Sequence, residues 1–134
     1  MSMQPPAVIF PDVELWATAY LRAALAARHE AYASGAFVSN KKPTANRAKT
    51  VVVRRDGGPQ RGLFDFARLT VRVWDDDEQT ASDLARLVRA LLMVSPGNGP
   101  VVGVESPSGP QGVPDSAQPQ KFLSVELKMR GVDF

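Results

Sequence analysis

The sequence predicts an α+β fold in which two α-helices pack on one face of a mostly antiparallel β-sheet. Two segments, from Asp12 to about Ala31 and from the Asp75–Glu78 run onward, repeat apolar residues at steps of three and four, as amphipathic helices do. The stretches "FDFARLTVRVWD" and "QKFLSVELKMRG" alternate apolar and polar residues, as half-buried strands do. Because each helix has one apolar stripe and the sheet one apolar face, the expected order α-β-β-β-α-β-β makes two layers.

Length and composition limit the alternatives. At 134 residues the chain fits one domain, expected over 1–134, with an N-terminal extension over 1–11 and long loops over 42–48 and 106–119. It has no cysteine and one histidine, which excludes disulfides, thiolate metal sites and cysteine nucleophiles. No apolar run approaches the roughly 20 residues that cross a bilayer, and the N-terminus lacks the basic segment of a signal peptide. We therefore expect an intracellular protein without a membrane partner.

The first helix is expected to bury an alanine-rich stripe. Pro11 suits a first helical turn, and Asp12 and Glu14 place negative charge where the helix dipole favours it. Ser34-Gly35 is expected to end the element. The predicted stripe consists of Val13, Trp16, Ala17, Tyr20, Ala24 and Ala27.

Three strands are expected next. A short strand covers 36–41, a β-branched strand covers 49–56, and Gly57-Gly58-Pro59 forces a reversal. The third strand places Ala67, Leu69, Val71 and Val73 on the core face, and Phe66, Arg68, Thr70, Arg72 and Trp74 on the other face.

The second helix has the clearest periodicity. Asp75 and Glu78 have capping-box spacing, although Asp77 could cap instead. The buried stripe is expected to consist of Ala81, Leu84, Ala85, Val88, Leu91 and Leu92, with Asp83 spaced to pair with Arg86. A short strand over 101–105 and a loop over 106–119 follow. The last strand places Leu123, Val125, Leu127 and Met129 inward, and Phe122, Ser124, Glu126, Lys128 and Arg130 outward.

The outer sheet face is the first candidate site. It is expected to carry Phe66, Arg68, Arg72, Trp74, Phe122, Lys128 and Arg130. Because monomers rarely leave such an aromatic surface open, we interpret it as an interface with another subunit.

A basic window that ends in a hairpin is the second candidate site. It holds Lys41, Lys42, Arg47, Lys49, Arg54, Arg55 and Arg61, against one acid, Asp56. Phosphate binding is one interpretation, and protection of an edge strand against aggregation is another. The Gly-Gly-Pro-Gln-Arg-Gly turn lacks the spacing of a phosphate-binding loop, and the window lacks aromatics for base stacking. Non-specific charge complementarity to DNA stays open.

No catalytic or metal site is expected. The carboxylates of Asp75, Asp76, Asp77 and Glu78 could bind Mg²⁺, but they are consecutive and immediately precede a helix, so we favour a function as capping charge, which explains them completely. His29 lies near a helix end without an obvious serine or cysteine partner. Because no nucleophile, base and oxyanion site assemble, we predict that the protein is not an enzyme and needs no cofactor.

The order of motifs resembles a known protein family. The segments are "FPDVELWATAYLRAAL", "VVVRRDGGPQRGLFDFARLTVRVWDDDEQTASDLARLVRALL" and "GPQGVPDSAQPQKFLSVELKMRG". The most specific parts are the V-x-R-R-x-G-G hairpin, the D-x-A-R-L-T-V strand and the A-x-x-L-A-R-L-V-R-A-L-L helix. Together they resemble the tail-terminator, or tail-completion, proteins of long-tailed (siphovirus-type) bacteriophages, particularly those of actinobacteria.

The resemblance implies a function in virion assembly. Such proteins form a hexameric ring on the last ring of the major tail tube protein, stop tube growth and present a surface to the head–tail connector or stopper protein. The implied location is the head-proximal end of the tail, after assembly in the host cytoplasm. DNA would be a non-specific passenger through the lumen. The alternatives are a head-completion (connector) subunit of the same virion and a small nucleic-acid-binding module.

Overall fold

The computed structural model describes residues 7–44, 49–114 and 116–133. Its elements in chain order are β1 (Val8–Ile9), α1 (Val13–Ala26), the 3-10 turn η1 (Ala31–Ala33), β2 (Phe37–Ser39), β3 (Thr50–Arg55), β4 (Gln60–Arg61), β5 (Phe64–Trp74), α2 (Glu78–Met93), β6 (Val101–Gly112), β7 (Gln120–Arg130) and β8 (Val132–Asp133). The predicted α+β class and the order of the main elements are confirmed. The short strands β1, β4 and β8 were not predicted.

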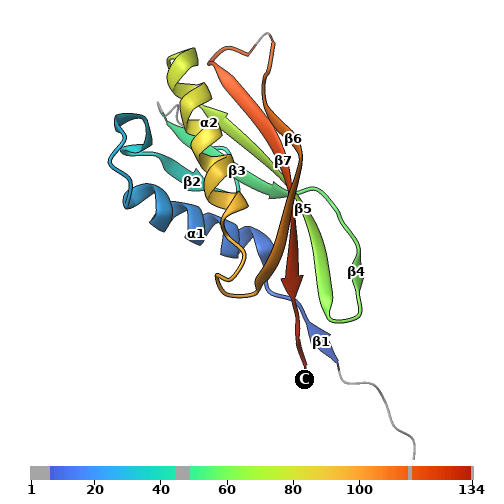
Figure 1. Cartoon of the computed structure of the whole chain (residues 1–134). Helices are drawn as coiled ribbons and strands as arrows, with labels where there is room; N and C mark the ends of the chain where they lie inside the picture. The colour runs from blue at the N-terminus through green and yellow to red at the C-terminus, as the bar shows by residue number, and fades with distance from the viewer. Residues whose placement is uncertain (1–6, 45–48, 115, 134) are drawn as a thin grey trace, which may run out of the picture.

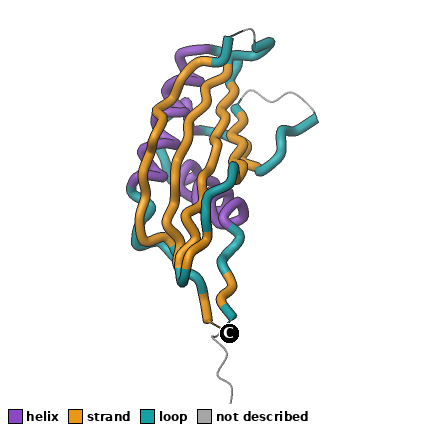
Figure 2. The backbone as a smooth tube through the Cα atoms, turned by 90° about the vertical axis from the view of Figure 1, so that its right-hand side faces the viewer, coloured by secondary structure: helices purple, strands orange, loops and turns teal. Residues whose placement is uncertain are grey.

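One sheet carries the architecture. Its strand order is β2-β3-β5-β7-β6, with β4 paired to β5, and every pairing except the parallel β2–β3 pair is antiparallel. Helices α1 and α2 lie on the same side of this sheet (Figure 1). Seen from the side in Figure 2, the helices stay behind the strands, so no helix covers the opposite face. We call this opposite face the outer sheet face.

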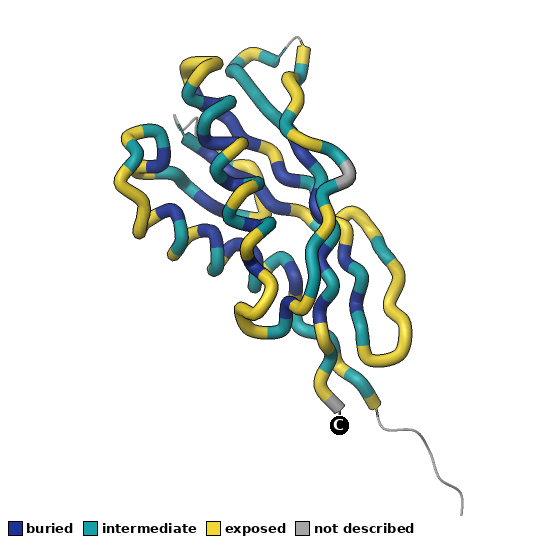
Figure 3. Tube along the Cα trace, in the orientation of Figure 1, coloured by how far each residue is buried: buried dark blue, intermediate teal, exposed yellow. Residues whose placement is uncertain are grey.

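The core lies between the two helices and the inner sheet face, where the buried residues gather (Figure 3). The predicted alternation is confirmed: all eight residues predicted to face inward on β5 and β7 are buried, namely Ala67, Leu69, Val71, Val73, Leu123, Val125, Leu127 and Met129. Val51 and Val53 of β3 extend the same layer, because they pair with Val73 and Val71.

The predicted buried stripe of helix α1 was partly wrong. The helix ends at Ala26, Ala27 is exposed, and Ala24 is only half-buried, whereas Leu21 and Leu25 are buried. The i, i+4 row of larger side chains faces the core because it removes more apolar surface from water than the alanine row would. Trp16 and Tyr20 flank this row as a stacked pair, with ring centroids 5.0 Å apart.

Helix α2 begins with the alternative cap. The Asp77 side chain accepts a hydrogen bond from the Thr80 backbone N–H, so Asp77 is the N-cap, and the capping box predicted for Asp75 does not form. Its predicted face is buried except for the half-buried Leu91, and Arg86 donates to Asp83 as expected.

The loop predicted over 106–119 was wrong for most of its length, because strand β6 is longer than predicted. The strand extends to Gly112, with irregularities in its register against β7, so among the described residues the loop is confined to 113–114 and 116–119. Since β6 is an edge strand, prolines that lack an N–H donor are tolerated there, and a Pro-, Gly- and Ser-rich sequence can still pair.

Candidate assembly surfaces

The basic window does not form a single surface. Lys41, Lys42, Arg54 and Arg61 are exposed, Lys49 and Arg55 are half-buried, and Arg47 lies outside the described residues. Arg61 lies in β4, in the hairpin that projects away from the helices (Figure 1). The window therefore separates into residues that can meet a partner and residues that hold the fold.

Arg55 belongs to the fold. Its guanidinium makes two hydrogen bonds of 2.6 Å to the carboxylate of Asp65, which is fully buried. It also donates to the carbonyls of Gly57, at 3.2 Å, and Gly58, at 3.1 Å. The hydrogen bonds that Arg55 donates to Asp65 raise the pKa of Arg55 above its ordinary value. Arg55 thus closes the hairpin turn onto β5, and its charge is compensated within the chain.

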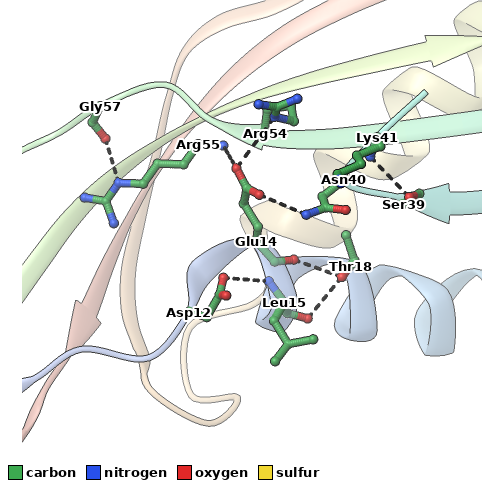
Figure 4. A network of polar contacts seen from close by, with 10 residues as sticks. All are labelled: Asp12, Glu14, Leu15, Thr18, Ser39, Asn40, Lys41, Arg54, Arg55 and Gly57. Carbon is green, nitrogen blue, oxygen red and sulfur yellow. Dashed lines mark hydrogen bonds and ion pairs between the residues drawn. The ribbon is translucent and has the colours of Figure 1, made fainter.

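Glu14 of α1 completes the open edge of β3 (Figure 4). Strand β2 pairs only with 50–52, so the backbone of Arg55 has no strand neighbour on that side. Glu14 Oε2 accepts from the Arg55 backbone N–H at 2.6 Å and lies 3.8 Å from Arg54 Nε, while Oε1 accepts from Asn40 at 3.2 Å. This carboxylate therefore joins α1 to the end of β3, because an unpaired strand N–H needs an acceptor.

The outer sheet face is less open than the sequence suggested. Trp74 is at the expected register but only 6% exposed, since Lys42 lies over its ring at 4.9 Å and residues 116–119 line the same hollow. Lys128 Nζ lies 4.2 Å from the Phe64 ring centroid, and Arg72 lies 5.7 Å from that of Phe122. The chain's own cations thus cover much of the aromatic surface through cation–π contacts.

Besides the hollow beside Trp74, the described part of the outer sheet face has two shallow hollows of opposite charge. The basic hollow, of about 310 Å³, is lined by Val52, Arg54, Arg55, Asp56, Thr70 and Arg72. The acidic hollow, of about 220 Å³, is lined by Phe66, Gly103, Val104, Glu105, Glu126 and Lys128. Sequence reasoning missed Glu105, because it assigned the residue to a short strand without a register. Only the pairing of β6 with β7 sets Glu105 opposite Glu126.

The acidic run acts in local structure. Asp77 caps α2, Glu78 forms an ion pair with Lys121 at 3.1 Å, and the buried Asp75 accepts from the Asp76 backbone N–H. Within the described ranges, no group of three or more His, Cys, Asp and Glu residues is arranged to hold a metal ion.

His29 is exposed after the end of α1. The neighbouring Arg28 donates to Glu30, and these hydrogen bonds, together with one from Glu30's own backbone, lower the pKa of Glu30 to about 2. The segment is thus a local ion pair on the surface.

Neither α1 nor α2, in the part of the chain that the structure describes, is long and apolar enough to cross a membrane.

No protein-family model matches the chain, and no curated protein sequence matches it.

Proposed function

We propose that this protein is a structural subunit of a phage virion that forms a ring on the end of the tail tube, stops tube growth and provides the joining surface for the head. The observation that carries the proposal is the outer sheet face, which no helix covers and which holds two hollows of opposite charge. Such a face suits contact between subunits, because complementary charges fix the register of an interface.

The exposed cations of the basic window support the same proposal. Lys41 and Lys42 lie in the loop after β2, Arg54 at the end of β3 and Arg61 in the projecting hairpin, and all four are exposed. They can meet an acidic neighbour or the DNA in a lumen. Arg55 is occupied by Asp65 and contributes no free charge. The resemblance of the motif order to tail terminators supports the same proposal. Such an assembly protein would carry its distinctive residues, here the exposed cations, on its surface and not in a cleft.

A phage that encodes this chain gives the direct test. With a nonsense codon in this gene, we expect electron micrographs to show tail tubes of variable excess length and heads without tails. Tails of normal length that fail to join heads would indicate the alternative, a connector subunit. Normal virions would refute both assignments.

Charge reversal at the hairpin tests the surface. The double variant Arg54→Glu/Arg61→Glu is expected to fold normally and to fail in tail completion or head joining. Arg55 is left intact, since its reversal would place two carboxylates against each other inside the protein. The control Arg86→Glu reverses one charge on the exposed side of α2 and should complement the nonsense phage fully.

The nucleic-acid-binding alternative predicts a different result. It requires a monomer that binds duplex DNA at physiological salt, with an affinity that falls steeply as salt rises. Fluorescence anisotropy with a labelled duplex, together with light scattering, separates this outcome from ring assembly.

A further inference from the structure

Two glutamates face each other on the outer sheet face without a cation between them. Glu105 of β6 and Glu126 of β7 are directly paired in register. Like charges in this position destabilise a sheet. Neither carboxylate forms an ion pair with any described residue of the chain, although Arg68 is the cross-strand neighbour of Glu126. The fold therefore keeps an uncompensated pair of negative charges at this position.

The surroundings of the pair suit a guanidinium group. Phe66 lines the acidic hollow beside the two carboxylates, and Gly103 adds no side chain to it. Carboxylates bind the planar fork of arginine with two parallel hydrogen bonds, and an aromatic ring can stack on it. Lys128, the basic residue that lines the hollow, holds its Nζ 4.2 Å from the Phe64 ring centroid and 5.7 Å from that of Phe66, and it forms no ion pair with either glutamate. We therefore expect the cation that binds the two carboxylates to come from another molecule.

The opposite side of the same face offers arginines. Arg54 and Arg72 line the basic hollow across β3 and β5, and both are exposed. Arg72 forms no ion pair within the described chain, and Arg54 has one long contact of 3.8 Å with Glu14. Asp56 lines the same hollow, whereas the charge of Arg55 is compensated by Asp65. Two arginine side chains thus remain available.

We propose that the Glu105–Glu126 pair of one copy binds Arg54 and Arg72 of the next copy, which joins copies of the chain head to tail. The acidic pair lies at the β6 edge, and Arg54 lies at the other side of the sheet, on the part of β3 beyond its pairing with β2. Arg72 lies between the two, on the central strand β5 of the same face. Two different patches that bind each other on successive copies make a heterologous interface, which closes into a ring when the rotation allows it. This inference rests on the self-assembly in the proposed function and assigns the residues that mediate it.

Complementary charge reversals test the pairing. The variant Arg54→Glu/Arg72→Glu has two acidic sides, and the variant Glu105→Arg/Glu126→Arg has two basic sides. We expect the wild type to associate beyond a dimer in sedimentation velocity, each reversal to weaken association about tenfold or more, and an equimolar mixture of the two to restore it. Arg86→Glu, on the exposed side of α2, is the control and should associate like the wild type.

Neutral variants separate assembly from folding. Arg72→Gln and Glu105→Gln/Glu126→Gln should keep the wild-type circular dichroism spectrum and still weaken association. A wild type that stays monomeric at all concentrations would overturn the pairing, as would reversals without effect or association that stops at a two-fold dimer. A monomer whose DNA binding is lost in Arg54→Glu/Arg72→Glu would make nucleic acid the occupant instead. The proposed function is judged separately by the tail length of the nonsense phage.

Discussion

Replacing Arg55 with alanine tests whether this arginine belongs to the fold. The substitution leaves the carboxylate of Asp65, which is fully buried, without its bidentate partner. Removing one member of a buried ion pair costs about 3–5 kcal/mol. Because 26% of the Arg55 side chain is exposed, water can partly replace it, so we expect the lower end, about 3 kcal/mol.

The partner substitution should cost less. Asp65→Asn removes the charge but keeps the shape and one acceptor oxygen, and Arg55 retains the carbonyls of Gly57 and Gly58. We expect a loss of about 1.5–2 kcal/mol, the scale of a hydrogen bond to a charged group. In the double variant the losses should fall short of their sum by about 1 kcal/mol or more, since the two residues act as one unit.

Urea unfolding followed by circular dichroism and tryptophan fluorescence measures these free energies by linear extrapolation. Arg54→Ala is the matched control, because Arg54 is the adjacent arginine, is exposed and has only a long ion pair. It should cost less than about 1 kcal/mol. The assignment of Arg55 to the fold would be refuted if Arg55→Ala lowered the free energy of unfolding no more than Arg54→Ala does. It would also be refuted if the losses of the Arg55 and Asp65 single variants added up to that of the double variant.

Four further outcomes follow from the same geometry. Glu14→Ala should lower the free energy of unfolding by about 1–3 kcal/mol, because it leaves a strand N–H without its acceptor, and Glu14→Gln by less; urea unfolding measures both. Gly58→Ala should be far more destabilising in thermal melts than Gly57→Ala, since both have positive φ but only at Gly58 would a Cβ meet a backbone oxygen, at 1.9 Å. Glu105→Gln should raise the monomer's free energy of unfolding by about 0.2–1 kcal/mol, as it relieves the repulsion with Glu126, and a loss of stability would contradict this. The carboxyl NMR signal of Glu30 should titrate near pH 2. Because its pKa is lowered in the folded state, its contribution to stability is present above the unfolded-state pKa of about 4.5 and is lost as the pH falls toward 2. A midpoint near 4.5 would show that the Arg28 pair does not form in solution.

The inward layer of the sheet was predictable because it depends on local periodicity. Apolar residues recur with a period of two in β5 and β7 and with a period of 3.6 in α2. These periods predict the same buried face in any α+β arrangement with one core. The helix cap was predictable only as a choice between Asp75 and Asp77, because both have suitable spacing and the choice depends on where β5 ends.

Other features depend on contacts that have no local signal. The prolines and glycines of 106–112 locally predict a loop. This segment forms the end of β6 only because it pairs with β7, a partner that local sequence does not reveal. Trp74 is buried on the outer sheet face because Lys42 and residues 116–119, distant in sequence, fold over it.

The candidate site divides in the same way. The sequence alone determined that cations concentrate between Lys41 and Arg61 and that arginines alternate outward on β5, since composition and period are visible in one dimension. Only the tertiary structure decided which cations are free, because Asp65 lies ten residues beyond Arg55 and reaches it through the hairpin. The same holds for the acidic pair: strand pairing sets Glu105 against Glu126, and electrostatic interactions depend on distance in space and not on separation along the chain.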